Sequence, residues 1–75
     1  MKTTTILLKS IDDVKTFVNL TVRFPYDIDL SSNRYVVDGK SIMGIFSLDL
    51  SKPIQVTIHA EDCDDLLNEL KPFEC

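Results

Sequence analysis

Two hydrophobic periodicities alternate along this chain of 75 residues, and their order leaves few folds open. In some stretches every second residue is apolar, as in a strand that buries one face. In others the apolar residues recur three and four positions apart, as in a helix with one buried side. The pattern predicts the order strand, helix, strand, strand, short helix, strand, helix.

The predicted strands cover residues 3–8, 26–31, 34–37 and 54–60, with a turn at Ser32-Asn33 before the third. The predicted helices cover residues 11–22, a short stretch after Ser41, and about 62–71. Four strands and three helices in this order indicate an α+β architecture, an open-faced β-sandwich in which three helices pack on one face of a four-stranded antiparallel sheet. A chain of this length has room for one domain, so residues 1–75 are predicted to form a single unit.

The helix predicted over residues 11–22 has a clear start. Ser10, followed three residues later by Asp13, has the form of a capping box. Asp12 and Asp13 lie in the first turn, where they complement the helix dipole. Pro25 prevents the helix from continuing. Its predicted buried stripe consists of Ile11, Val14, Phe17, Val18 and either Thr21 or Val22.

The stretch around Ser41 combines a turn, a helix cap and a high density of apolar side chains. Asp38-Gly39 predicts a tight turn, because glycine reaches positive φ without steric cost. Ser41 can then cap a helix by accepting a hydrogen bond from a backbone N–H near Met43 or Gly44. A helix of about two turns cannot bury every apolar residue that follows, so we expect an exposed docking surface. The alternative is a capped helix that lies flat on a small core.

The run Lys40-Ser41-Ile42-Met43-Gly44-Ile45-Phe46-Ser47-Leu48 resembles the regulatory-serine segment of HPr, the small phosphocarrier family of the bacterial sugar phosphotransferase system. The resemblance extends roughly from Lys9 to Leu70 and fits the predicted order of elements. It implies the HPr fold and phosphorylation of Ser41 by an HPr kinase. It also implies that a transcription regulator is a second partner, and that partners contact Lys40, Ile42, Met43 and Phe46.

The chemistry that defines the family's carriers is missing from this chain. Those carriers hold a phosphoryl group on a histidine in the motif Gly-x-His-Ala-Arg-Pro-Ala, at the N-terminus of their first helix. An ungapped alignment through Ser41 places Ser10 at the position of the histidine and Asp12 at that of the arginine. A phosphohistidine needs an imidazole, and Asp12 and Asp13 oppose an approaching phosphate. The chain is therefore expected not to relay phosphate, and in this it is similar to the catabolite-repression homologue within the family.

Composition excludes several other classes of function. The formal net charge is −4, which argues against a nucleic-acid partner. No apolar run approaches the length of a membrane span, and the N-terminal apolar stretch is too short for a signal peptide. A cytoplasmic location is the expectation. The apolar surface expected around Phe46 predicts a monomer or a weak homodimer.

The remaining candidate residues predict no catalytic or metal site, no cofactor and no enzymatic activity. His59 is the one histidine, and it alternates outward on the last predicted strand. The acidic residues 61, 62, 64 and 65 lack the spaced ligands and turn glycine of a calcium loop and indicate a charged helix start. Cys63 is predicted to be a buried thiol, and Cys75 has no assigned role.

The sequence thus predicts a regulatory, protein-binding module related to the phosphotransferase system, with Ser41 as its site of modification. Two alternatives remain open. One is a protein-interaction or structural domain with the same fold and no phosphorylation. The other is an enzyme or phosphocarrier that uses residues outside the recognised motifs.

Overall fold

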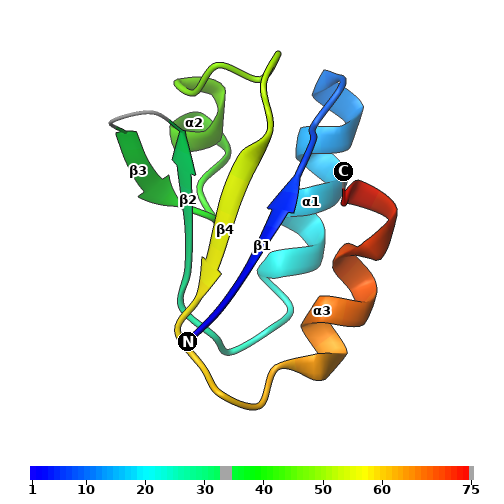
Figure 1. Ribbon diagram of the computed structural model, residues 1–75. Coiled ribbons are helices and arrows are strands. Elements are labelled where there is room, and N and C mark those ends of the chain that lie inside the picture. The colour runs from blue at the N-terminus through cyan, green and yellow to red at the C-terminus, as the bar shows by residue number, and fades with distance from the viewer. Residues whose placement is uncertain (33–34, 75) are drawn as a thin grey trace.

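The predicted order of elements is confirmed in the computed structural model, which describes residues 1–32 and 35–74 (Figure 1). The strands are β1 (Lys2–Ile6), β2 (Ile28–Ser32), β3 (Tyr35–Asp38) and β4 (Ile54–Ile58). The helices are α1 (Ile11–Thr21), α2 (Ile42–Phe46) and α3 (Asp64–Leu70), followed by the 3₁₀ turn η1 (Lys71–Phe73).

The strands form one antiparallel sheet in the order β1-β4-β2-β3. Lys2 lies opposite Ile58 and Ile6 opposite Ile54, so the first strand pairs with the last. All three helices lie behind the sheet in Figure 1 and leave its other face uncovered. The predicted α+β, open-faced sandwich is therefore confirmed.

Some predicted strand limits are shifted. Tyr26 precedes β2, and its hydroxyl donates to Asp65 Oδ1 at 3.1 Å. Ser32 belongs to β2 instead of the predicted turn. The rest of that turn at Asn33 and the predicted strand start at Arg34 lie outside the described residues. Leu8 lies beyond the end of β1, although its side chain is buried as its apolar character requires.

A single apolar core fills the space between the sheet and the helices. Its buried side chains are Ile6, Leu8, Val14, Phe17, Leu20, Ile28, Leu30, Ile45, Leu48, Ile54, Val56, Ile58, Cys63, Leu66 and Leu70. The buried position predicted for Cys63 is thereby confirmed.

The stripe predicted for α1 is correct only in its central turns. Val14, Phe17 and Thr21 are buried, together with Leu20, which the prediction omitted. Of the two alternatives for the last position, Thr21 is the buried one. Placing Ile11 in the core was wrong, because Ile11 is 62% exposed, and Val22 is likewise 54% exposed. Both lie at the ends of the helix, and the buried contacts of α1 are confined to the turns between them.

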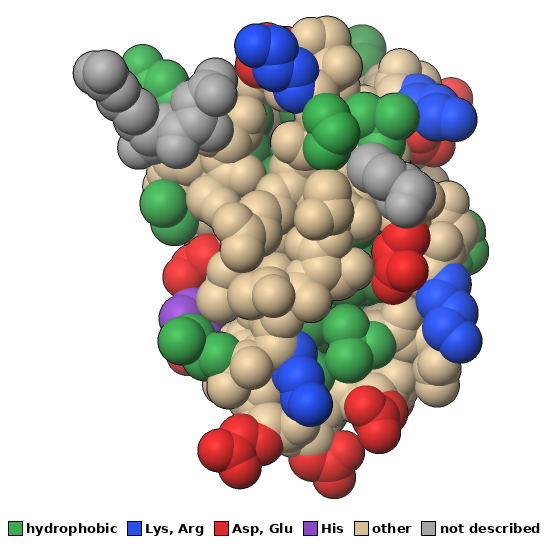
Figure 2. All heavy atoms as spheres, viewed as in Figure 1, with side chains coloured by type: hydrophobic (Ala, Val, Ile, Leu, Met, Phe, Trp, Pro, Cys, Tyr) green, Lys and Arg blue, Asp and Glu red, His purple; other side chains and the backbone are tan. Residues whose placement is uncertain are grey.

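The uncovered face of the sheet is polar and carries little charge at its centre (Figure 2). The side chains that alternate away from the core there are Thr3, Thr5, Ser31, Gln55 and Thr57. Within residues 1–32 and 35–74, no helix has the length and apolar character needed to cross a membrane.

Candidate functional site

The segment that leads into α2 is held in place by contacts with distant parts of the chain. Gly39 donates its N–H to the Ile28 carbonyl at 2.7 Å. A Cβ at Gly39 would stand 2.7 Å from Ile28 Cγ2 and 3.1 Å from the Ile28 carbonyl oxygen. The φ of Gly39 lies outside the left-handed region, so the expected positive φ was wrong. Glycine is needed here because the backbone approaches β2 too closely for a side chain.

A second anchor comes from Thr21, at the end of α1. Its hydroxyl lies 3.0 Å from the Gly39 carbonyl oxygen in a buried contact and 3.1 Å from the Val18 carbonyl oxygen. This role of Thr21 was not predicted from the sequence, in which Thr21 was expected only as one of two alternatives for a buried stripe. A polar residue at a stripe position was the available signal, since a buried hydroxyl requires a partner.

Lys40 and Ser41 follow directly. The Lys40 ammonium donates to the Phe24 carbonyl at 2.7 Å, and the Lys40 N–H donates to Asp38 Oδ1 at 2.9 Å. Ser41 Oγ accepts the Gly44 N–H at 3.2 Å, which confirms the predicted N-cap of α2. Contacts with β2, α1 and the chain around Phe24 therefore fix the position of the segment that leads to Ser41 at the start of α2.

The apolar residues of α2 divide between the core and the surface. Ile45 is fully buried, and Ile42 is partly buried against the core. Met43 is 76% exposed and Phe46 is 39% exposed, and their spacing of three residues places them on one side of the helix. The expectation that a short helix cannot bury all its apolar side chains is confirmed, although α2 also packs on the core as the flat-helix alternative requires.

The start of α1 is closed by its own polar groups. Ser10 Oγ accepts the Asp13 N–H at 3.1 Å, and the Asp13 carboxylate accepts the Lys9 N–H at 3.0 Å. This confirms the predicted capping box, with its return bond one residue earlier than the usual partner. Asp12 is exposed in the same turn. Two carboxylates at this helix start make it unfavourable for an anion.

His59 lies at the other end of the sheet from Ser10. It directly follows β4, and its Nε2 is 2.6 Å from Asp29 Oδ2. Because residue 58 lies opposite Lys2 at the start of β1, and Ser10 comes after the end of β1, nearly the full length of that strand separates the two (Figure 1). His59 is exposed, as predicted.

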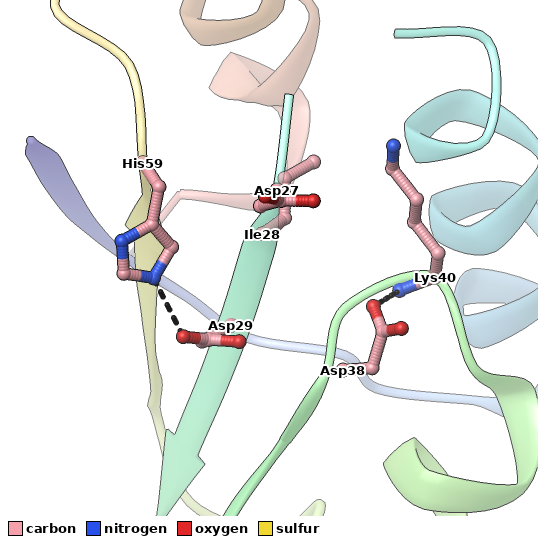
Figure 3. Close-up of a pocket in the computed structure, with 6 residues that line it drawn as sticks. All are labelled: Asp27, Ile28, Asp29, Asp38, Lys40 and His59. Carbon is pink, nitrogen blue, oxygen red and sulfur yellow. Dashed lines mark hydrogen bonds and ion pairs between the residues drawn. The ribbon is translucent and has the colours of Figure 1, made fainter. Parts of the chain in front are cut away.

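A hollow of about 490 Å³ lies beside His59, and Figure 3 shows the side chains around it. Its lining residues are Asp27, Ile28, Asp29, Asp38, Lys40 and His59. Asp29 and Asp38 lie opposite each other on β2 and β3, so negative charge predominates and a phosphate would be repelled. Among the described residues, no group of His, Cys, Asp or Glu side chains is arranged to hold a metal ion.

The acidic residues near Cys63 are placed as a charged helix start. Asp64 and Asp65 occupy the first turn of α3. Asp65 Oδ1 accepts the Leu66 N–H at 2.8 Å as well as the Tyr26 hydroxyl. Loss of solvent, and then the hydrogen bond to Asp65, raise the pKa of Tyr26 above its ordinary value. The acidic side chains here therefore stabilise the helix and its contact with the chain before β2.

Residues 13–73 match the family model described as the PTS HPr component phosphorylation site. This span is most of the chain and includes Ser41, α2 and the whole core-forming sheet except β1. The chain belongs to the HPr family. The matched span begins three residues after Ser10.

Solved structures of HPr proteins share the fold. HPr-C-His from Thermoanaerobacter tengcongensis is 27% identical, with a TM-score of 0.79, and the match covers 93% of this chain and 86% of that one. HPr from Bacillus anthracis is 24% identical with a TM-score of 0.75, covering 99% and 96%. The Bacillus subtilis catabolite repression protein Crh, solved as a swapped, intertwined dimer, is 27% identical with a TM-score of 0.67, covering 87% and 77%.

Proposed function

We propose that this HPr-family chain is a regulatory, protein-binding module, acting as one domain over residues 1–75, that is switched by phosphorylation of Ser41. The observation that carries the proposal is the placement of Ser41. It caps a helix whose Met43 and Phe46 are exposed on one side. A modification of Ser41 would therefore act beside an apolar surface that can contact a partner.

Phosphorylation would change this surface by charge. A phosphoserine carries roughly −2 at neutral pH and three strong acceptor oxygens. The helix dipole and the N–H groups of the first turn of α2 favour that charge at Ser41. Met43 and Phe46 would then be next to a dianion instead of a neutral hydroxyl, so partners that prefer one form would release the other. Lys40 supplies a positive charge beside the modified residue. An HPr kinase and a transcription regulator are the partners we infer.

We also infer that the chain does not carry a phosphohistidine. Ser10 takes the place of the histidine, and its hydroxyl is occupied by the Asp13 N–H. The negative charge of Asp12 and Asp13 opposes phosphate at this helix start. His59 is bonded to Asp29 at the far end of the sheet, away from the family's site of transfer.

Incubation with an HPr kinase and ATP, followed by intact-mass measurement, tests the role of Ser41. We expect one added phosphate on the unmodified sequence and none on Ser41→Ala. Ser10→Ala and Ser47→Ala should still accept one phosphate, because the first lies at another helix and the second follows α2. If the unmodified sequence gains no phosphate under conditions that modify an HPr with the regulatory serine, the chain is an interaction or structural domain without this switch.

Incubation with phosphoenolpyruvate and enzyme I tests the second inference. The mass of the chain should not change, while an HPr with its histidine gains a phosphate in the same reaction. An acid-labile phosphate on His59, or on any other residue, would show that the chain is a carrier and would contradict the proposal.

A further inference from the structure

The two outer edges of the sheet, β1 and β3, differ in whether other segments of the chain cover them. The end of β1 is closed by the C-terminal segment, because the Leu7 N–H donates to the Phe73 carbonyl at 2.8 Å and Ile6 forms a bridge with Glu74. At the opposite edge, β3 pairs with β2 on one side only, within residues 1–32 and 35–74. An edge strand with free backbone groups is a template for pairing with another strand.

Three of the four side chains of β3 are apolar, and they lie on both faces of the sheet, whereas the last residue is the exposed Asp38. Val36 is 66% exposed and lies opposite Ser31, on the face that the helices leave uncovered. Tyr35 is 67% exposed and lies on the helix face with Val37. Residues 35–38 contain no lysine, no proline and no bulge, and their one charged side chain, Asp38, stands at the end of the strand, so little in this segment prevents pairing at the edge.

The register of β3 identifies the backbone groups that remain available. Asp29 lies opposite Asp38, and the Gly39 N–H donates to the Ile28 carbonyl. In an antiparallel ladder this pattern directs the backbone of Val37 toward β2 and that of Val36 toward the free edge. The Asp38 carbonyl already accepts the Ser41 N–H at 3.1 Å. Val36 is therefore the residue best able to donate to and accept from an added strand.

We propose that β3 pairs in antiparallel orientation with β3 of a second copy of this chain, about a two-fold axis at Val36. This register places the two Val36 side chains opposite each other on the uncovered face and Tyr35 opposite Val37 of the second copy on the helix face. It joins the two sheets into one and covers the apolar side chains of both edges.

The occupant is a second copy because the strand is complementary to itself. Apolar residues meet apolar residues on both faces, and the Asp38 carboxylates lie away from the axis, where like charges repel least. A register centred on Asp38 would place the two carboxylates opposite each other. The net charge of −4 on each chain opposes association, so added salt should strengthen the dimer. Ser41, Met43 and Phe46 are not among the residues that this register places opposite one another, so variants of β3 test the dimer separately from the proposed function.

Sedimentation equilibrium tests the interface, with Val36→Lys as the disrupting variant and Met43→Lys as the matched control on α2. We expect the unmodified chain to dimerise reversibly. Val36→Lys should weaken the dimer at least about tenfold, because two lysines would face each other at the axis. Met43→Lys should dimerise like the unmodified chain. A chain that stays monomeric at millimolar concentration would overturn the proposal, as would a dimer lost in Met43→Lys and kept in Val36→Lys.

Disulfide trapping tests the register of the dimer directly, and it does not depend on a variant that disrupts the interface. In a Cys75→Ser background, Val36→Cys should form a disulfide-linked dimer on mild oxidation, because directly opposed residues of two strands have the spacing that a disulfide spans. Gln55→Cys, exposed on β4 in the middle of the same face, is the control and should remain mostly unlinked. Equal cross-linking of the two variants would overturn the proposal, because it would indicate random collision.

Discussion

The N-termini of α1 and α2 begin with the same three residue types but differ in charge and in the contacts that hold them. Lys9-Ser10-Ile11 and Lys40-Ser41-Ile42 each place a serine at the N-cap. In both, the serine Oγ accepts the N–H three residues later, at 3.1 Å in α1 and 3.2 Å in α2. That later residue is Asp13 in α1 and Gly44 in α2. The first helix thus begins with carboxylates, whereas the second begins with no acidic residue and an exposed methionine.

The two caps also differ in what holds them. The cap of α1 is local, since its side-chain hydrogen bonds join Lys9, Ser10 and Asp13, which lie within four positions of one another. The segment before α2 depends on Ile28, Thr21 and Phe24, which lie far away in the sequence. A helix of five residues cannot form by itself, because nucleation costs more than so few bonds return. A short helix can present a serine in a fixed position only if tertiary contacts hold the chain that enters it.

The largest expected effect is that of Gly39→Ala, which attacks the tertiary support of α2. Its Cβ would stand 2.7 Å from Ile28 Cγ2 within the core. We expect a loss of about 1–3 kcal/mol in the free energy of unfolding, as for other overpacked sites. Urea unfolding measures the loss, with Ser31→Ala on the uncovered face as a near-neutral control. Amide exchange should show that α2 loses more protection than α1. Equal losses in both helices would contradict the comparison.

Thr21→Val acts on the same support and should lower the free energy of unfolding by a similar amount. It keeps the shape of the side chain but removes the hydroxyl that lies 3.0 Å from the Gly39 carbonyl oxygen. A buried polar group left without its partner costs about 1–3 kcal/mol. Thr21→Ser is the matched control, since it keeps the hydroxyl and loses only a methyl group. If Thr21→Val proves as stable as the unmodified chain, this hydrogen bond does not anchor the segment before α2.

Ser10→Ala and Ser41→Ala compare the two caps directly. Each should lower the free energy of unfolding by about 1 kcal/mol, because each removes one acceptor for an N–H of the first turn. Asparagine at either position should restore most of the loss, since its side-chain oxygen also caps. The two caps share no partner, so the double variant should show additive losses in urea unfolding. A non-additive result would show that the helix starts are coupled.

The smallest expected effect concerns Asp49, in the turn after α2. Hydrogen bonds from the hydroxyl and then the N–H of Ser51 lower the pKa of the Asp49 carboxyl below its ordinary value. The folded state therefore favours the ionised form, and this contribution is present above the ordinary aspartate pKa of about 4 and is lost as pH falls through the lowered value. In Ser51→Ala, a carboxyl NMR titration should place the pKa of Asp49 closer to its ordinary value. An unchanged titration would show that the Ser51 hydroxyl does not cause the shift.

Features encoded by near neighbours could be predicted from the sequence. The caps at Ser10 and Ser41 depend on residues within four positions, and the alternation in β2 and β4 marks their buried faces. These features, with the order of elements, were sufficient for the fold class. The pairing of β1 with β4 was not predicted, since it joins residues at opposite ends of the sequence and leaves no local pattern.

The candidate site was predictable in composition but less so in geometry. The segment around Ser41 was found from its residues, yet which apolar side chains are exposed depends on how α2 is turned against Val37 and the core. The same limit explains the error at Ile11, because helical spacing does not reveal which turns of α1 the sheet covers. Thr21 and Gly39 were not linked in advance because their contact spans 18 residues.

The closure of β1 by Phe73 and Glu74 has a consequence for biosynthesis. β1 is synthesised before the other three strands, yet it pairs with residues around Ile58 and is closed by Phe73 and Glu74. β1 therefore stays unpaired until β4 has been synthesised, whereas the hairpin of β2 and β3 can close as soon as it is made. Nascent chains stalled before β4 should expose β1 to chaperones and proteases, and synthesis through Glu74 should end that exposure.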